Sequence, residues 1–498
     1  MLLDNCVVFA FQVFEQREMP KLPPPGRNFG SCQPGAWSYH ELPASSGGVC
    51  LDGSPFGFYY MPAVPNPRRE LEHLRNNDSW LLYFEGGGWC FSPEDCALRA
   101  DTRAGSSVSW EKRDGQVTYG GIVNKCCFCT RFCRFHRIFL KSCDGHAFAG
   151  DANIAAVRSA DGQRGRVLHS AGQAILRGVI NVLAAEFGIR DAKSVLVAGC
   201  SAGGMAALLN AERIRSQLRA VGAQPQRFKV AAISGLFFPA RVGVESSESL
   251  LSPFEDQVRA LVHLGKVALP ARCSSIMPIG QEWRCLLSTG LLDALPEDLP
   301  AFVYQSRLDL WQTNCILAAG RSRYFGLNCS SSPAWHRCLG WMQPLKASAR
   351  CSPQQWATLR AFEEANDAAI HGSASLLRPG YGSFVHSCYD HCASTSGLIN
   401  TGATLRPGTY NDSINLREAL HLWFATQPDK DPVPAWNHSH TGCWNAAVAA
   451  SVPGKANEHW CRRPECAPGE KMHKDDTAGQ RARIRSRGWK WFLDEQLQ

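Results

Sequence analysis

A serine-centred element near the middle of the chain constrains the fold more than any other feature. The apolar run Ser194-Val-Leu-Val-Ala198 leads into Gly199-Cys200-Ser201-Ala202-Gly203, and a helical pattern follows from Ala202 to Leu218. Small residues beside a serine permit the tight, strained turn on which a nucleophilic serine stands between a strand and a helix. The following helix directs its N-terminal amides at the same point. We therefore expect Ser201 to be a nucleophile, with a purely structural glycine-rich turn as the alternative.

Strand-like and helical segments alternate along the chain. Short apolar runs that end in Gly, Ser or Asp are typical of buried parallel strands followed by functional loops. Three further runs of this kind are Trp80–Phe84, Phe228–Ile233 and Ala301–Gln305. Val167–Phe187 carries apolar residues at helical spacing. This alternation predicts an α/β fold with a mostly parallel central sheet flanked by helices.

The length allows more than one domain, but α/β enzymes often fold as one unit of more than about 250 residues. In this chain of 498 residues, Lys21-Leu-Pro-Pro-Pro-Gly26 indicates a linker, and a polar, basic segment begins at Lys471. We expect a disordered lead-in or linker over residues 1–28 and a single domain with disulfide-pinned insertions over 29–470. A basic tail over 471–498 completes the chain.

Cysteine content indicates the compartment in which the chain folds. The chain has 22 cysteines, and they are scattered along it. Scattered cysteines in such number are typical of disulfides formed in an oxidising compartment. Four Asn-x-Ser sequons agree with this, at Asn77, Asn328, Asn411 and Asn437. We expect a secreted protein or one in the lumen of the secretory pathway, although the N-terminal segment has no convincing signal-peptide pattern.

Composition excludes several classes of protein. Hydrophobic residues make up 45% and charged residues 19%, which is globular composition and excludes general disorder, coiled coil and collagen. The 52 basic and 44 acidic residues give a net charge of +8 and are interleaved, which argues against nucleic-acid binding. No stretch approaches the ~18 apolar residues of a transmembrane helix. We expect neither a nucleic-acid partner nor a transmembrane segment.

A second glycine-rich element follows another predicted strand. Tyr83-Phe-Glu-Gly-Gly-Gly-Trp-Cys90 has three consecutive glycines, whose backbone N–H groups can point into a cleft without obstruction. An oxyanion hole requires such amides, and the element is similar to the HGGG-type loop of lipases and esterases. A phosphate-binding loop is disfavoured because no Lys-Ser/Thr follows the glycines. A simple tight turn is the alternative.

A serine nucleophile needs a base and a group that orients the base. Histidine suits the first role because its unperturbed pKa lies close to neutral pH. In α/β-hydrolases the acid follows the serine along the chain, and the histidine follows the acid. Asp309 comes just past the predicted strand Ala301–Gln305, and His386 and His391 lie further on in a cysteine-flanked loop. The residues alone do not decide which of the two histidines is the general base.

Five blocks together resemble the pectin acetylesterase/Notum family of α/β-hydrolase-fold carboxylesterases. They stand in the family's order and span most of the chain: Leu81–Cys90, Cys143–Asp151, Gly199–Gly204, Leu308–Gln312 and Ser387–Cys392. The resemblance implies an α/β-hydrolase-like fold with disulfide-pinned insertions. It also implies hydrolysis of carboxylic esters without a metal or an organic cofactor.

The resemblance also implies roles for individual residues. Ser201 becomes the nucleophile, Asp309 the orienting acid and His391 the general base of a Ser-His-Asp acyl-enzyme mechanism. The oxyanion hole is implied to consist of three backbone N–H groups, those of Gly88, Trp89 and Ala202.

The Cys143–Asp151 block is closer to the plant-type branch of the family than to animal Notum. We therefore expect the substrate to be O-acyl, most of all acetyl, esters on polysaccharides such as pectin. Separately, we expect the enzyme to be a monomer. One alternative is a Notum-like lipid deacylase acting on acylated protein. Another is a catalytically inactive homologue that binds glycans.

The cysteine-rich segment Asn124–His136 departs from the family pattern. Its cysteines, its histidine and Cys143 are dense enough to bind zinc. The spacing lacks paired C-x2-C knuckles, however, and a secreted chain would oxidise these residues. We therefore prefer disulfides or free thiols for the cluster Cys126–Cys143 and keep a zinc site as the alternative.

Overall fold

The computed structural model describes fourteen stretches of the chain. They are 36–64, 78–117, 119, 121–124, 131–155, 166–239, 253–317, 335, 338, 351–386, 391–392, 404–405, 414–425 and 436–439. The expected lead-in 1–28 and basic tail 471–498 lie outside the described residues. The same holds for three of the four sequons, at Asn77, Asn328 and Asn411.

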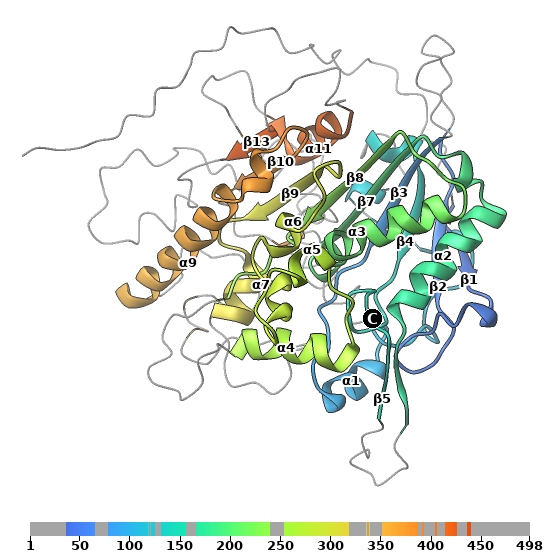
Figure 1. Cartoon of the computed structure of the whole chain (residues 1–498), viewed down its shortest axis with the longest axis horizontal. Helices are drawn as coiled ribbons and strands as arrows, with labels where there is room; N and C mark the ends of the chain where they lie inside the picture. The colour runs from blue at the N-terminus through green and yellow to red at the C-terminus, as the bar shows by residue number, and fades with distance from the viewer. Residues whose placement is uncertain are drawn as a thin grey trace, which may run out of the picture. The chain divides into compact units, whose positions relative to one another are not determined.

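A nine-stranded sheet organises the structure (Figure 1). Strand β2 runs antiparallel to both of its neighbours, β1 and β4, and the strands from β4 to β13 run parallel to one another. In spatial order the strands are β1 (Ser38–Glu41), β2 (Gly57–Met61), β4 (His136–Leu140), β3 (Ser79–Phe84), β7 (Ser194–Cys200), β8 (Arg227–Ile233), β9 (Ala301–Ser306), β10 (Gly382–His386) and β13 (Trp436–Ser439). The predicted mostly parallel sheet is confirmed.

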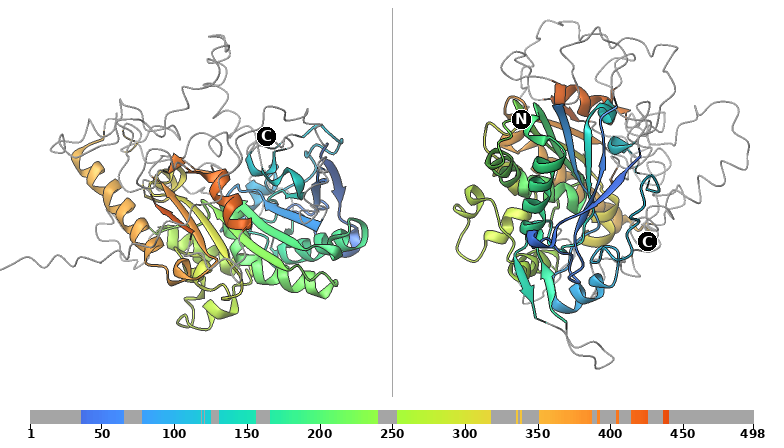
Figure 2. Two further views of the ribbon diagram at one scale, coloured as in Figure 1. Left: turned by 90° about the horizontal axis from the view of Figure 1, so that it is seen from above. Right: turned by 90° about the vertical axis from the view of Figure 1, so that its right-hand side faces the viewer.

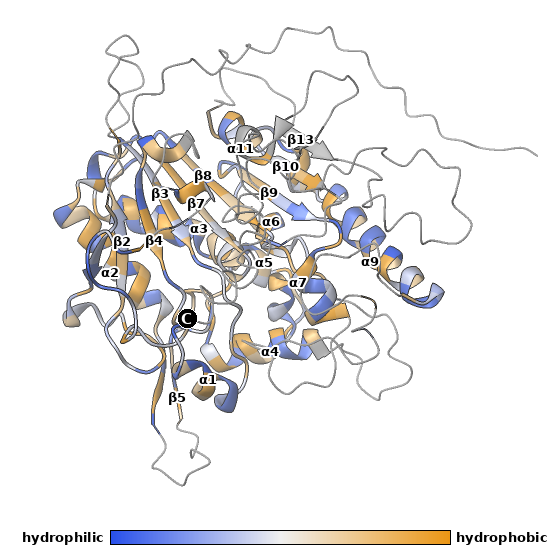
Figure 3. Cartoon of the chain, turned by 180° about the vertical axis from the view of Figure 1, so that it is seen from behind, coloured by the Kyte–Doolittle hydropathy of each residue, from blue (hydrophilic) through white to orange (hydrophobic). Residues whose placement is uncertain are grey.

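Alternate residues of each central strand face opposite sides of the sheet, and both sides are buried. Leu82 and Val197 pack on the side covered by α2 (Gly172–Glu186) and α3 (Ala202–Ala220). Leu81 and Leu196 pack on the other side, with the apolar residues of α11 (Leu416–Ala425). Figure 2 shows the green helices and orange α11 on opposite faces, and Figure 3 shows the largely apolar central strands between them.

Shorter elements complete the described structure. The remaining α-helices are α1 (Pro93–Ala100), α4 (Pro253–Gly265), α5 (Ala271–Ser274), α6 (Gly290–Asp293), α7 (Leu310–Gln312) and α9 (Pro353–His371). Two small antiparallel sheets pair β5 (Ala152–Ile154) with β6 (Leu168–Ser170) and β11 (Thr404–Leu405) with β12 (Ile414–Asn415). Single turns of 3-10 or π-helix are η1 (Ala44–Ser46), η4 (Gly121–Val123), η5 (Arg131–Arg134), η6 (Ile189–Asp191), η7 (Glu282–Leu286), η8 (Thr313–Leu317) and η9 (Ala374–Leu377).

The helix expected over Val167–Phe187 begins later than its apolar spacing predicts. Leu168–Ser170 forms strand β6, which pairs with β5, and α2 starts only at Gly172. The backbone hydrogen bonds of this pair satisfy groups that a helix would otherwise use. The spacing of apolar residues could not reveal a pairing partner that lies outside the segment.

Disulfides are present, as the cysteine content predicts. Five are described: Cys50–Cys143, Cys90–Cys96, Cys200–Cys392, Cys273–Cys285 and Cys338–Cys351. None of the helices in the described part of the chain has the length and apolar character needed to cross a membrane.

The sheet and α3 meet at a backbone contact. Gly203 lies in the first turn of α3, where a Cβ atom would overlap the carbonyl oxygen of Phe84 and lie 2.6 Å from that of Glu85. Backbone atoms at the end of a strand cannot move aside in the way a flexible side chain can. Only glycine therefore allows α3 to start this close to β3.

We predict that Gly203→Ala lowers the free energy of unfolding by about 3 kcal/mol, because the added methyl group meets rigid backbone. Gly222→Ala is the matched control, since a Cβ there meets nothing within 4 Å and only its φ of +91° is strained. That control should cost about 1 kcal/mol. Urea unfolding followed by tryptophan fluorescence measures both, and equal losses would contradict the steric explanation.

Candidate active site

The candidate nucleophile stands on a sharp turn between β7 and α3. Ser201 has φ of 58° and ψ of −129°, a combination that non-glycine residues rarely adopt, and it immediately precedes the first residue of α3. Its backbone N–H donates a 2.9 Å hydrogen bond to the carbonyl oxygen of Ile233 at the end of β8. The predicted strand–turn–helix context is therefore present.

The glycine-rich loop that follows β3 lies against this turn. A Cβ atom on Gly86 would lie 2.9 Å from the Cβ of Ser201, so the two backbones are in contact. Gly87 and Gly88 have φ of 123° and 68°, values that favour glycine. Ala202, as the first residue of α3, has a backbone N–H without an acceptor inside the helix. The three predicted oxyanion residues thus belong to two segments that meet beside Ser201.

The candidate acid and base are joined by a buried hydrogen bond. The Nδ1 atom of His391 lies 2.8 Å from Oδ2 of Asp309, and both side chains are almost fully buried. The carboxylate also accepts hydrogen bonds from the backbone N–H of Gln312 at 2.9 Å and from Nε2 of Gln305 at 3.3 Å. Because the ionised carboxylate accepts, Nδ1 carries the proton, and Nε2 is the ring atom that can take up another.

A disulfide connects the serine turn to the histidine segment. Cys200 precedes Ser201, Cys392 follows His391, and the two cysteines are bonded with their Cα atoms 5.5 Å apart. The backbone N–H of Cys392 also donates a 3.2 Å hydrogen bond to Oγ of Ser234, the residue after β8. These two links bring the neighbours of the candidate nucleophile and the candidate base together. The role of Ser234 had no signal in the sequence beyond its place after a strand.

His386, the other histidine candidate, ends strand β10 opposite Ser306 of β9. The residues between it and His391 lie outside the described part of the chain. The hydrogen bond to Asp309 therefore distinguishes His391 from His386, which pattern alone could not do.

An aromatic cluster lies beside the candidate base. Trp311 stacks on His391 with ring centroids 6.1 Å apart. Trp311 also contacts Trp89 at 5.8 Å and Phe237 at 5.5 Å, and Phe254 of α4 lies 6.2 Å from Trp89. The two tryptophans stand in blocks that the sequence singled out, whereas the phenylalanines carried no such signal. The cluster gives the site an apolar wall.

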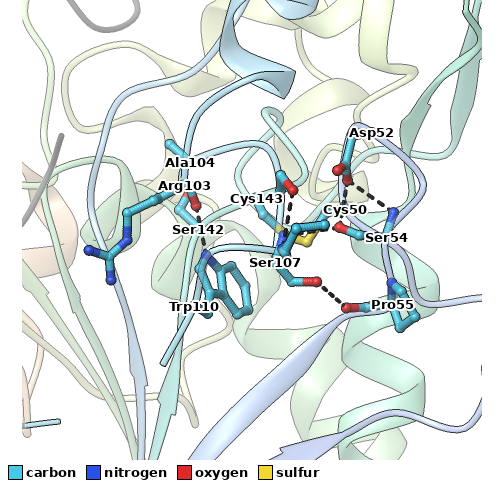
Figure 4. Close-up of a disulfide and its surroundings, with 12 residues drawn as sticks. Cys50, Asp52, Ser54, Pro55, Arg103, Ala104, Ser107, Trp110, Ser142 and Cys143 are labelled. Carbon is cyan, nitrogen blue, oxygen red and sulfur yellow. Dashed lines mark hydrogen bonds between the residues drawn. A yellow bond between two sulfur atoms is a disulfide. The ribbon is translucent and has the colours of Figure 1, made fainter. Parts of the chain in front are cut away.

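The Cys143–Asp151 block packs against the end of the glycine-rich loop. The Cys50–Cys143 disulfide fixes the start of the block, next to the hydrogen-bonded turn around Asp52 and Ser54 (Figure 4). The carbonyl oxygen of Gly145 accepts a 3.1 Å hydrogen bond from the backbone N–H of Cys90. The block thus contacts the residue directly after Trp89.

Within this block His146 is fully buried. Its Nδ1 atom donates to the carbonyl oxygen of Asp144 at 3.0 Å, which leaves Nε2 as the unprotonated atom. Burial lowers the pKa of His146 to about 4 and raises the pKa of the Asp144 carboxyl group to about 6. His146 is therefore neutral in the folded protein at neutral pH.

The zinc alternative loses two of its expected ligands. Cys133 and Cys143 are both in disulfides, whereas Cys126, Cys127 and Cys129 lie outside the described residues. Among described residues, the one group close enough to hold a metal ion comprises Cys90, Cys96 and His146. A disulfide occupies both sulfur atoms of that group, so they are not available as thiolate ligands.

The parallel sheet, the serine turn between strand and helix and the chain order Ser, Asp, His define a protein of the α/β-hydrolase type. The sequence model of the pectinacetylesterase family matches residues 39–443. The chain therefore belongs to the pectin acetylesterase family, a family of carboxylic-ester hydrolases. The expected fold class, family and enzyme class are confirmed.

Individual relatives agree with this assignment. Pectin acetylesterase 11 of Arabidopsis thaliana is 28% identical over 388 residues, which cover 78% of this chain and 86% of that protein. Pectin acetylesterase 5 of the same plant is 26% identical over 401 residues, with 80% and 82% covered. Human palmitoleoyl-protein carboxylesterase NOTUM is 27% identical over 266 residues, which cover 52% of this chain and 49% of that protein.

We predict that the double variant Cys200→Ser/Cys392→Ser loses at least 10-fold in ester turnover, because the histidine segment is no longer tied to the serine turn. The bond spans 192 residues, for which chain entropy gives a stabilisation of about 5 kcal/mol. Cys273→Ser/Cys285→Ser is the control, since its 12-residue span corresponds to about 3 kcal/mol and lies outside the candidate site. Wild-type turnover in the folded Cys200→Ser/Cys392→Ser protein would refute the prediction.

We predict that the free energy of unfolding of His146→Gln falls less steeply between pH 7 and pH 4 than that of the wild type. The folded pKa of His146, about 4, lies below its unfolded value, so its contribution is complete above pH 6.5 and is lost as pH falls towards 4. The difference between the folded and unfolded pKa of His146 corresponds to about 3 kcal/mol. Free energies of unfolding between pH 7 and pH 4 measure it.

The control for this measurement is His371→Gln. A hydrogen bond to Asp367 raises the pKa of His371, so its contribution is present in acid and is lost as pH rises. In this control the free energy of unfolding should fall between pH 7 and pH 4 at least as steeply as in the wild type. Parallel acid limbs for His146→Gln and the wild type would contradict the assignment of a neutral, buried imidazole.

Proposed function

We propose that this chain is a serine esterase that removes O-acyl groups, foremost acetyl groups, from polysaccharides such as pectin. In this proposal Ser201 is the nucleophile, His391 the general base and Asp309 the group that orients it. The observation that carries it is the buried His391–Asp309 hydrogen bond, which the Cys200–Cys392 disulfide connects to the strained turn at Ser201.

The proposed reaction has two acyl-transfer steps. Nε2 of His391 takes the hydroxyl proton of Ser201 as Oγ attacks the ester carbonyl carbon. The tetrahedral intermediate collapses, the C–O bond to the sugar breaks, and His391 gives the proton to the leaving alcohol. Water then attacks the acyl-enzyme by the same route and releases the carboxylic acid. Throughout, Asp309 accepts a hydrogen bond from the N–H at Nδ1 of His391 and stabilises the imidazolium form.

Backbone amides are proposed to stabilise the oxyanion. The N–H groups of Gly88, Trp89 and Ala202 belong to segments in contact with the turn at Ser201, and the α3 N-terminus adds a positive end of the helix dipole. Such fixed dipoles cost no reorganisation when charge develops on the carbonyl oxygen.

The comparisons favour a polysaccharide substrate over an acylated protein. Pectin acetylesterases 11 and 5 of Arabidopsis align over 86% and 82% of their own length, whereas human NOTUM aligns over 49% of its length. The disulfides support folding in an oxidising compartment, and we include secretion in the proposal on that ground.

A second candidate function is favoured by the aromatic cluster. Trp311 stacks on His391, and the buried residues Trp89, Phe237 and Phe254 pack around Trp311 and one another, so the surroundings of His391 are apolar, which suits an acyl chain longer than acetyl. A lipid deacylase of the kind named among the relatives is therefore the competing hypothesis.

Hydrolysis of p-nitrophenyl esters from acetate to palmitate, together with release of acetate from acetylated pectin, tests the proposal. We predict fastest turnover of the acetate ester and a loss of about 10⁴-fold or more in Ser201→Ala. Alanine fits the turn as well as serine does, so the variant should fold. Ser375→Ala, a buried serine in η9, is the control and should keep full activity.

A preference for chains of eight or more carbons would overturn the acetyl substrate and support the lipid deacylase. Absence of any Ser201-dependent hydrolysis in the folded wild-type protein would overturn the esterase itself and favour an inactive glycan-binding homologue.

A further inference from the structure

The glycine-rich loop after β3 is fastened at both ends. At its start, the backbone N–H of Glu85 donates to the carbonyl oxygen of Leu140 at 2.9 Å, and the Glu85 carboxylate pairs with Nζ of Lys141 at 2.9 Å. At its end, Cys90 is bonded to Cys96 in α1, and the backbone N–H of Phe91 donates to Asp95 at 3.3 Å. The stretch between these anchors contains the glycines.

A single buried side chain reaches the middle of the loop. Arg99 of α1 is 1% exposed, and its guanidinium group donates a 2.8 Å hydrogen bond to the carbonyl oxygen of Gly87. The same group donates to the carbonyl oxygen of Ala104 at 3.0 Å and to Oγ of Ser142 at 3.4 Å. Three acceptors on three segments therefore fix its plane. Figure 4 shows Ala104 and Ser142 on neighbouring segments beside Trp110.

The Gly87 carbonyl and the Gly88 N–H belong to one peptide plane. Peptide bonds are trans in the described part of the chain, so this C=O and this N–H point in opposite directions. A bond that holds the carbonyl oxygen on the Arg99 side therefore holds the N–H on the opposite side. Between two glycines a peptide plane can turn over at little steric cost, so the sequence of the loop does not select this orientation by itself.

We propose that Arg99 is a positioning residue for ester hydrolysis, one that holds the Gly87–Gly88 peptide so that the Gly88 N–H faces the oxyanion. This inference rests on the proposed function, because it gives the amide of Gly88 its role there. The guanidinium does not touch the substrate; it acts through the peptide plane. Its positive charge also polarises the peptide and makes the N–H a stronger donor.

Neighbouring carboxylates support a charged guanidinium at this buried position. Burial lowers the pKa of Arg99, and the charges of Asp95, Asp144 and Glu85 act in the opposite direction. Arginine stays protonated in proteins under ordinary conditions. The guanidinium of Arg99 beside the glycine loop is therefore charged at neutral pH.

The test compares Arg99→Met and Arg99→Lys with Arg137→Met. Arg137 is equally buried, in β4, and its guanidinium donates to the carbonyl oxygen of Asn124, so it matches the loss of a buried cation without touching the glycine loop. For each variant we measure kcat and KM on p-nitrophenyl acetate, thermal stability, and the inhibition constant of a trifluoromethyl ketone, which forms a tetrahedral adduct with the serine.

We expect Arg99→Met to lower kcat by about 100-fold with KM changed less than about 2-fold, as for the loss of one oxyanion donor. The inhibition constant should rise by a similar factor. Arg99→Lys should have a kcat between those of Arg99→Met and the wild type, because lysine keeps the charge but lacks the planar guanidinium group. Arg137→Met should lower the melting temperature and leave kcat of the folded protein within 3-fold of wild type.

Hydrogen exchange of the backbone amides of residues 86–89 provides a readout that needs no activity. Arg99→Lys, the gentler variant, should exchange faster there than wild type, and Arg137→Met should not. If the wild type shows no Ser201-dependent turnover, the proposed function fails, and this exchange still decides whether Arg99 holds the loop. Unchanged exchange, or kcat within 3-fold of wild type in folded Arg99 variants, would overturn the inference.

Discussion

The candidate site depends on close backbone contacts, made possible by glycines, at the ends of β3 and β7. Ser201 holds a left-handed conformation that costs a non-glycine residue about 1–3 kcal/mol, so its surroundings have to maintain it. Gly203 lets α3 begin against the last carbonyl groups of β3, and Gly86 lets the next loop touch the serine turn. A bulkier residue at either place would separate the segments that supply the proposed nucleophile and the proposed oxyanion donors.

The sequence predicts the central strands because each is a short apolar run with a clear end. β3, β7, β8 and β9 are of this kind, and they are neighbours in the sheet in that order. The edge strand β1 is polar and four residues long, so its strand character comes from pairing with β2 and not from its own residues. β6 escaped prediction for the same reason, since its partner β5 decides where α2 can begin.

Local pattern predicts the candidate site only in part. Ser201 follows β7 directly and Asp309 comes shortly after β9, so the strands place them at one edge of the sheet. In the sequence His391 comes shortly after another histidine, His386, and the hydrogen bond to Asp309 is what distinguishes the two. Arg99 gave no signal, because a basic residue in an eight-residue surface helix is usually solvated, and burial of this one depends on acceptors from three other segments. Disulfide pairing likewise depends on the folded chain.

The long reach of the bond between Cys200 and Cys392 has a consequence for biosynthesis. During synthesis, Ser201 and Asp309 leave the ribosome well before the histidine that binds the aspartate, and the sulfur that secures the serine turn lies 192 residues further along. While these residues are being made, a nascent chain carries the proposed nucleophile without the proposed base. Formation of the proposed site is therefore tied to late synthesis of the chain and to oxidation of these two cysteines.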